Sequence, residues 1–123
     1  DAEWKVMEAY LGMPAGDLDI HGTYRGTDEG KKLKEAGTTH WNYYGDGYLG
    51  TDEYGFTGVP GGYRNYSTGS YASMGYVGGH WTSSIYSGTH AWERLLTADN
   101  THIGRYASPY NNGHSVRCVM VEE

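Results

Sequence analysis

The stretch from Gly50 to Arg64 has the sequence GTDEYGFTGVPGGYR, and the rest of the chain is organised around it. A helix is excluded there, because glycine costs about 1 kcal/mol and proline roughly 3 kcal/mol at an interior helical position. The glycines instead favour a short buried strand that bends sharply twice, since glycine adopts positive φ without strain. We expect Asp52, Phe56 and Arg64 to find partners in the strands that follow.

The composition predicts one small domain with an aromatic core. The 123 residues are 37% hydrophobic, and they include thirteen tyrosines and four tryptophans but a single phenylalanine. This length indicates one domain, so residues 1–123 are treated as a single unit. Tyrosine can keep its ring in a core and its hydroxyl in water, so tyrosines are expected both to coat the core and to reach the surface.

Charge and hydropathy exclude two classes of partner. The formal net charge is −6 at pH 7, whereas nucleic-acid binding needs clustered lysine and arginine. No apolar run approaches the roughly 20 residues that cross a bilayer. We therefore expect no nucleic-acid partner and no membrane span.

Helical signals occur in the first third of the chain. Trp4, Met7 and Leu11 repeat at helical spacing, and Asp1 is placed to cap a helix over residues 1–11. A second helix is expected over residues 28–36, with Thr27 as its cap and a glycine as its stop. Three lysines of that helix are expected in solvent: Lys31, Lys32 and Lys34.

Strand signals dominate the second half. Side-chain character alternates over residues 79–85, 90–97, 101–106 and 114–121, with polar turns at 86–89 and 98–100. Two helices followed by a glycine-bent antiparallel meander make an α+β fold. Regular hairpins would place His80 opposite Leu95, and His102 opposite Leu96, so that the two histidines lie on opposite faces of the sheet.

Five ordered blocks of residues resemble a known bacterial family, the Fibrobacter succinogenes major paralogous domain. The blocks lie at residues 29–34, 50–64, 79–84, 91–95 and 113–119, so the resemblance covers nearly the whole chain. It implies a C-type-lectin-like fold and a secreted or surface-attached bacterial module. The chain departs from the family pattern at Thr82, where a second tryptophan is usual, and at His114, where an aromatic residue is usual.

The resemblance also implies that the domain is N-terminally incomplete. The family usually has a Cys-Pro-containing segment before the position of Asp1, and its cysteine is the natural partner of the position matched by Cys118. The resemblance therefore leaves open a structural thiol or an orphaned disulfide half at Cys118. It also predicts that the chain needs a companion N-terminal segment or a second copy, because the strand ending at Val121 would otherwise have an open edge.

Metal binding and catalysis have little support in the sequence. Zinc needs three or four convergent ligands, and the histidines are not spaced to provide them. Calcium is possible at turn residues, but the sugar-binding triplets of C-type lectins are absent. Those turn residues are Asp46, Asp52, Glu53, Asp99 and Asn100. Cys118 alternates with Val116 and Met120 on what should be a buried strand face, which is unlike a nucleophile. We expect no enzyme and no cofactor.

Binding is the function that the residues favour. Aromatic side chains beside arginine are typical of binding hot spots, and aromatic faces also stack on sugars. The expected ligand residues are Tyr71, His80, Tyr86, Trp92, Arg94 and Tyr106. The expected structural residues are Trp4, Phe56, Arg64, Trp81, Val116, Arg117 and Cys118, with the two arginines buried among carbonyl or acidic groups. We expect an extracellular, non-enzymatic module for recognition or adhesion that binds a glycan or a protein; the alternative is a fibre subunit assembled through strand edges.

Overall fold

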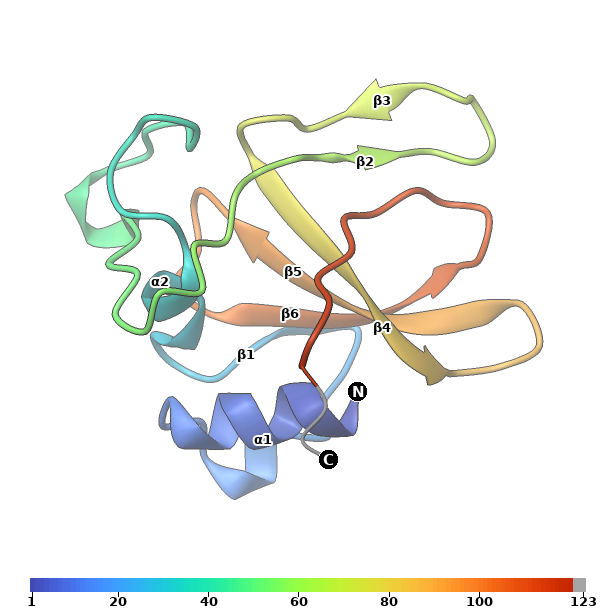
Figure 1. Cartoon of the computed structure of the whole chain (residues 1–123), viewed down its shortest axis with the longest axis horizontal. Coiled ribbons are helices and arrows are strands. Elements are labelled where there is room, and N and C mark those ends of the chain that lie inside the picture. Colours follow the sequence, from blue (N-terminus) through green and yellow to red (C-terminus); the bar gives the residue numbers. More distant parts are fainter. Residues whose placement is uncertain (121–123) are drawn as a thin grey trace.

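The computed structural model describes residues 1–120, which form a mixed α+β domain with two sheets (Figure 1). The helices are α1 (Ala2–Tyr10) and α2 (Glu29–Leu33), with short 3₁₀ turns at Ala15–Asp17 and Asp46–Tyr48. The strands are β1 (Thr23–Arg25), β2 (Tyr63–Arg64), β3 (Tyr71–Ala72), β4 (Val77–Ile85), β5 (His90–Thr97) and β6 (Ile103–Pro109). The main sheet is antiparallel in the order β1-β6-β5-β4, and β2 and β3 form a separate hairpin.

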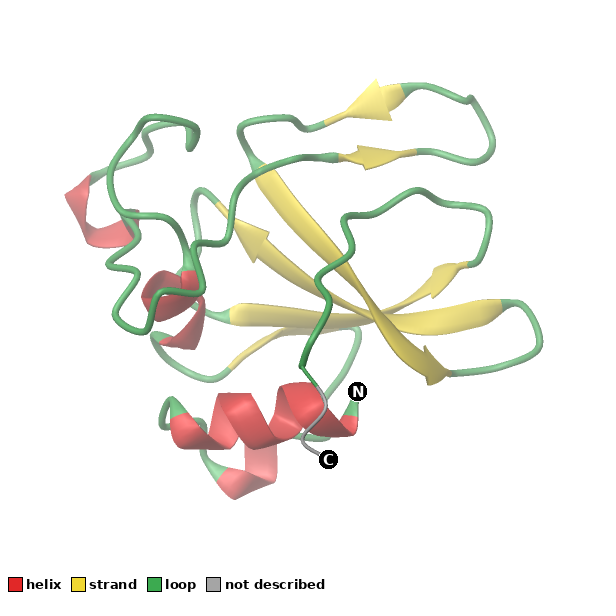
Figure 2. Ribbon diagram, in the orientation of Figure 1, coloured by secondary structure: helices red, strands yellow, loops and turns green. Residues whose placement is uncertain are grey.

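Loops occupy much of the chain, and the main sheet lies between α1 and the β2–β3 hairpin in the view of Figure 2. Strand β4 is one edge of the sheet. The α+β class expected from the sequence is therefore confirmed for the described residues.

The three long strands are largely those expected. Strand β5 has the predicted bounds, β4 begins two residues earlier, and β6 starts and ends later than predicted. The predicted register was wrong: His80 pairs with Arg94, not Leu95. The reason is a bulge between Trp81 and Ile85, which shifts the pairing and puts His80 on the same face of the sheet as Arg94.

Both helices lack the predicted side-chain caps. Asp1 occupies the cap position of α1, but its carboxylate binds Arg94 and Arg105 instead of the helix amides. Helix α2 is shorter than predicted, because the chain after Leu33 becomes extended and pairs with the glycine-rich stretch. Lys34 is buried, contrary to the prediction of a solvated face, and its ammonium donates to the carbonyls of Tyr48, Thr97 and Asn100. Burial lowers the pKa of Lys34 to about 8.

The stretch from Gly50 to Arg64 is central, but it is not the continuous strand that was expected. It makes isolated parallel bridges through Gly50 to Ala36, through Gly58 to Lys34 and through Gly62 to Gly78. It thereby ties the chain after α2 to the edge strand β4. Gly62 has φ +71°, and a Cβ there would collide with the carbonyl of Ala72, so glycine is required at this position.

The hydrophobic core lies between α1, α2 and one face of the sheet. Its buried members are Leu11, Met13, Leu33, Trp41, Leu96, Ala98 and Ile103. Trp41 donates its indole N–H to the carbonyl of Gly58 at 2.9 Å, which satisfies the polar end of the largest core side chain. The anchor role expected for Trp4 holds in part, since this half-buried ring packs against the core from α1.

The strand predicted over residues 114–121 does not form within the described residues, and its last position, Val121, lies outside them. Only Ser115 pairs with β4, through bonds to Gly79 and Trp81. The following segment, residues 116–120, belongs to no strand and makes no backbone–backbone hydrogen bond to the rest of residues 1–120. The expected burial of its apolar row is therefore wrong: Val116 is 75% exposed, and Cys118 is also exposed.

Candidate functional site

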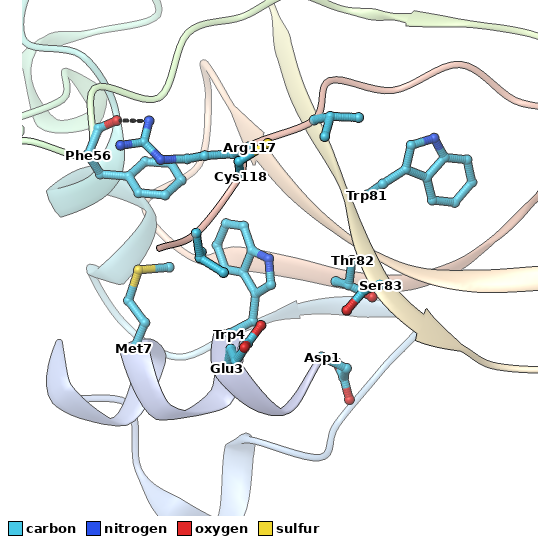
Figure 3. Close-up of a pocket in the computed structure, with 12 residues that line it drawn as sticks. Asp1, Glu3, Trp4, Met7, Phe56, Trp81, Thr82, Ser83, Arg117 and Cys118 are labelled. Atoms are coloured by element: carbon cyan, nitrogen blue, oxygen red, sulfur yellow. Dashed lines mark hydrogen bonds between the residues drawn. The ribbon is translucent and has the colours of Figure 1, made fainter. Parts of the chain in front are cut away.

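A groove of about 560 Å³ lies between α1, the outer half of β4 and residues 116–119 (Figure 3). Its lining includes the first two turns of α1, Phe56 from the glycine-rich stretch, and residues 81–83 of β4. Figure 3 shows Trp4 and Phe56 facing this space from different elements. The segment 116–119 forms its remaining wall, and we call this cavity the α1–β4 groove.

Trp4 is the floor residue that connects α1 to the sheet. Its ring meets Phe56 edge-on, with 5.7 Å between centroids, and lies 6.0 Å from the ring of His80. The guanidinium of Arg94 lies 5.8 Å from the Trp4 ring on the sheet side. These contacts hold the Trp4 ring on its sheet side, and the rest of the ring lines the groove.

Arg117 holds the C-terminal wall in place. Its Nη1 donates to the carbonyl of Phe56 at 2.6 Å, and its guanidinium lies 4.2 Å from the Phe56 ring centroid. The side chain is exposed, so the prediction of a buried structural arginine is wrong, although its partner is a carbonyl as expected. Arg64 is also exposed, and it is positioned by two backbone bonds with Gly113 rather than by burial.

Residues 81–83 of β4 form one wall of the groove, mainly through their backbone. The amide of Trp81 donates outward to Ser115 at 3.1 Å, whereas its ring points away from α1 and packs edge-on against His114 at 4.6 Å (Figure 3). Ser83 follows in the bulge, has no partner residue on β5 and is exposed. The edge of the sheet is therefore open where it borders the groove.

A buried ionic network lies between α1 and the sheet. Glu8 is 0% exposed and binds Arg25 through both carboxylate oxygens, at 2.6 and 2.8 Å. The same carboxylate contacts Arg94 at 3.1 Å, and Asp1 bridges Arg94 to Arg105. Burial lowers the pKa of Arg94 to about 10, although the charge of Glu8 raises it. Two carboxylates thus allow three arginines to lie on neighbouring strands.

The network was not predicted, but one signal pointed to it. Glu8 follows Trp4 by four residues and precedes Leu11 by three, so it lies on the apolar stripe of α1. A carboxylate on such a stripe needs a cationic partner in the core. The identity of its partners required the strand order, which brings Arg25 on β1 and Arg94 on β5 beneath α1.

The six expected ligand residues do not form one surface. Arg94 is 0% exposed and His80 is buried, and both face α1. Tyr106 packs against Tyr24 on the other face of the sheet, while Tyr71 lies on the separate hairpin and is 84% exposed. Burial lowers the pKa of His80 to about 4, with smaller effects from the charges of Arg117 and His114.

Tyr86 and Trp92 do lie together, and His21 joins them. The Tyr86 and Trp92 rings are 4.8 Å apart, His21 lies 5.2 Å from Trp92, and the guanidinium of Arg105 is 3.8 Å from the Trp92 ring. His21 lies in a segment without clear periodicity, so no sequence pattern predicted its contact with these rings. The cluster is a second aromatic surface, distinct from the groove.

Two of the acidic turn residues are bound within their own loops. Asp52 accepts from the amide and the hydroxyl of Thr57, both at 2.7 Å, and Asp46 accepts from Tyr43. Asp99 raises the pKa of Tyr76 to about 12 through a hydrogen bond. Within residues 1–120, no group of three or more histidine, cysteine or acidic side chains is placed to hold a metal ion.

Ser108, His114 and Glu93 form a buried polar trio. Both Ser108 Oγ, at 3.0 Å, and Glu93 Oε2, at 2.7 Å, approach the same ring nitrogen of His114. A hydrolytic triad instead needs the histidine between the other two groups, with one bound to each ring nitrogen. This arrangement holds the segment around His114 against the sheet.

Comparison with known families gives a match over nearly the whole chain. The model of the Fibrobacter succinogenes major domain matches residues 1–120. The chain belongs to this family. This confirms the resemblance found in the sequence blocks. No curated protein and no solved structure matches the chain.

Within the Fibrobacter succinogenes major domain, the α1–β4 groove combines a floor of apolar aromatic side chains with the backbone of an edge strand. None of the helices in the described residues of this domain is both long and apolar enough to cross a membrane. The aromatic floor and the bordering edge strand make the groove the candidate binding surface.

Proposed function

We propose that this chain is a non-enzymatic recognition or adhesion module at the bacterial surface, C-type-lectin-like in fold, which binds a protein partner in the α1–β4 groove. The observation that carries this proposal is the groove itself, about 560 Å³ with Trp4 and Phe56 on its floor. Its C-terminal wall exposes Val116 and Val119, whose side chains contact no core. An aliphatic wall suits a protein better than a glycan, because sugars need aromatic faces and polar partners.

A glycan remains the alternative ligand, and the aromatic cluster of His21, Tyr86 and Trp92 is the surface that would bind it. Fibre assembly is the alternative function, in which the groove would receive a neighbouring copy of the chain. The apolar residues around the open edge favour that alternative over catalysis.

The test compares three exposed positions in protein and glycan binding arrays. Val116→Glu alters the groove, Tyr86→Ala alters the aromatic cluster, and Tyr71→Ala alters the distant hairpin as a matched control. The proposal predicts protein binding that is lost only with Val116→Glu. Binding that survives this change, or that fails only with Tyr86→Ala, contradicts it. Antibody labelling of intact cells tests the proposed surface location.

A further inference from the structure

We propose that the α1–β4 groove recognises its protein partner as an extended peptide strand that adds to the free edge of β4. This inference rests on the proposed function and names the form in which the partner binds.

Both long walls of the groove carry unpaired main chain. The Trp81 amide faces outward, since it donates to Ser115, and the carbonyl of the same residue lies on the same side of the strand. Ser115 is the last residue of the C-terminal segment that pairs with β4 within residues 1–120. Beyond Ser115, no backbone hydrogen bond joins the C-terminal segment within residues 1–120 to the Trp81 carbonyl or the Ser83 amide, and Ser83 has no residue paired with it on β5. Trp81 and Ser83 both line the groove.

The opposite wall repeats the pattern. Residues 116–120 belong to no helix or strand, and their amides and carbonyls make no backbone–backbone hydrogen bond to any described residue. Arg117 anchors this wall at Phe56, so it stays near β4 without closing onto it. An extended chain is the ligand that can satisfy rows of backbone donors and acceptors, because its own groups alternate with the same period.

The side chains around the groove suggest the composition of the strand. The floor is formed by Trp4 and Phe56, which favours apolar residues at alternate positions of the peptide. Glu3 lines the same groove from α1, and its carboxylate has no ion-pair partner among residues 1–120. The partner strand should therefore carry a lysine or arginine near the α1 side.

The experiment uses a phage-displayed library of random linear peptides, followed by affinity measurements on individual synthetic binders. Ser83→Pro removes one outward amide, and proline is tolerated at an edge or bulge position. It should weaken peptide binding by roughly tenfold, as the loss of a directed hydrogen bond would. Ser83→Ala keeps the amide and should bind as the wild type does.

A second signature separates backbone pairing from side-chain contact. N-methylation of the peptide at successive positions should weaken binding at alternate residues only, because only every second amide faces β4. Glu3→Gln should weaken selected peptides that contain lysine or arginine. Normal melting of Ser83→Pro would show that its fold is intact.

The outcomes distinguish this inference from the proposed function. If Val116→Glu abolishes binding but Ser83→Pro and N-methylation leave it unchanged, the groove binds a partner and strand addition is wrong. Failure to select any peptide also overturns strand addition. Self-association in sedimentation that Ser83→Pro abolishes, without any bound peptide, would place a second copy in the groove and overturn a separate peptide partner.

Discussion

Glu8 is the residue on which the attachment of α1 depends. Its carboxylate is fully buried and neutralises Arg25 and Arg94 at the same time, so it compensates the cost of burying both cations. A neutral residue of the same shape would leave the arginines without that charge.

Glu8→Gln should lower the free energy of unfolding by about 3–5 kcal/mol, the usual cost of leaving buried charges uncompensated. Urea denaturation measures this change. Glu3→Gln on the same helix is the matched control, because its side chain is exposed; it should change stability by no more than about 0.5 kcal/mol. Equal stability of the two variants would show that the ionic network is not required.

His80 should make the protein less stable in mild acid. Its folded pKa is about 4, below its unfolded value of 6.5, so the unfolded state binds more protons between these values. The contribution of neutral His80 to the free energy of unfolding is fully present above about pH 6.5. It is lost as the pH falls through about 4, by roughly 3 kcal/mol in total.

His80→Gln removes this titration. The difference in unfolding free energy between wild type and variant should therefore shrink or reverse between pH 6.5 and pH 4. Chemical denaturation at a series of pH values follows that difference, and the shared acidic groups cancel in it. A difference that is independent of pH would contradict the assignment.

At the scale of elements, the glycines of β4 allow neighbouring segments of the chain to approach its backbone closely. A Cβ on Gly78 would lie 2.7 Å from the carbonyl oxygen of Val59, which belongs to the backbone of the glycine-rich stretch and cannot rotate away. The two segments are joined there by the bridge between Gly62 and Gly78. The contact makes the strand sensitive to a single methyl group.

Gly78→Ala should destabilise the protein by about 1–3 kcal/mol, as overpacking of a close contact does. Gly47→Ala is the control, because a Cβ there meets nothing within 4 Å. It should be neutral or slightly stabilising, since alanine reduces the entropy of the unfolded chain. Thermal melting of both variants measures the difference, and similar melting temperatures would refute the predicted clash.

The sequence predicted elements well where local pattern and tertiary pairing agree. Strand β5 lies between β4 and β6, and its alternation gave its bounds correctly. The segment 116–120 alternates equally well but has no pairing partner within the described residues, so the same pattern gave a wrong strand. Strand β1 has only three residues, which is too short for periodicity to reveal.

The candidate site was harder to predict than the fold. Trp4 and Phe56 were named as structural, and the groove uses both of them. The expected ligand set failed to converge because its members lie on different surfaces. Tyr106 faces the side of the sheet opposite to Arg94, and Tyr71 lies on the separate β2–β3 hairpin. The bulge after Trp81 shifted the register of His80, which faces α1 together with Arg94. Bulges have no reliable sequence signal, so which face of β4 a side chain occupies required the structure.

For the whole molecule, the network under α1 should make unfolding a single event. The helix is joined to β1, β5 and β6 through Arg25, Arg94 and Arg105, so it cannot separate without exposing all three charges. Far-UV circular dichroism and tryptophan fluorescence should give the same urea midpoint. Trp4→Phe removes the fluorescence of α1 and should leave coincident curves; an earlier transition that disappears in this variant would show that α1 unfolds independently.

Cys118 is the single cysteine of the sequence, and it is exposed on the wall of the α1–β4 groove. The protein therefore carries a natural attachment point for an optical reporter at the surface proposed to bind. A maleimide dye should couple to the native protein without denaturant and without any engineered residue. A polarity-sensitive fluorophore at this thiol would then change its emission whenever the groove becomes occupied, so partners could be titrated against an otherwise unaltered chain.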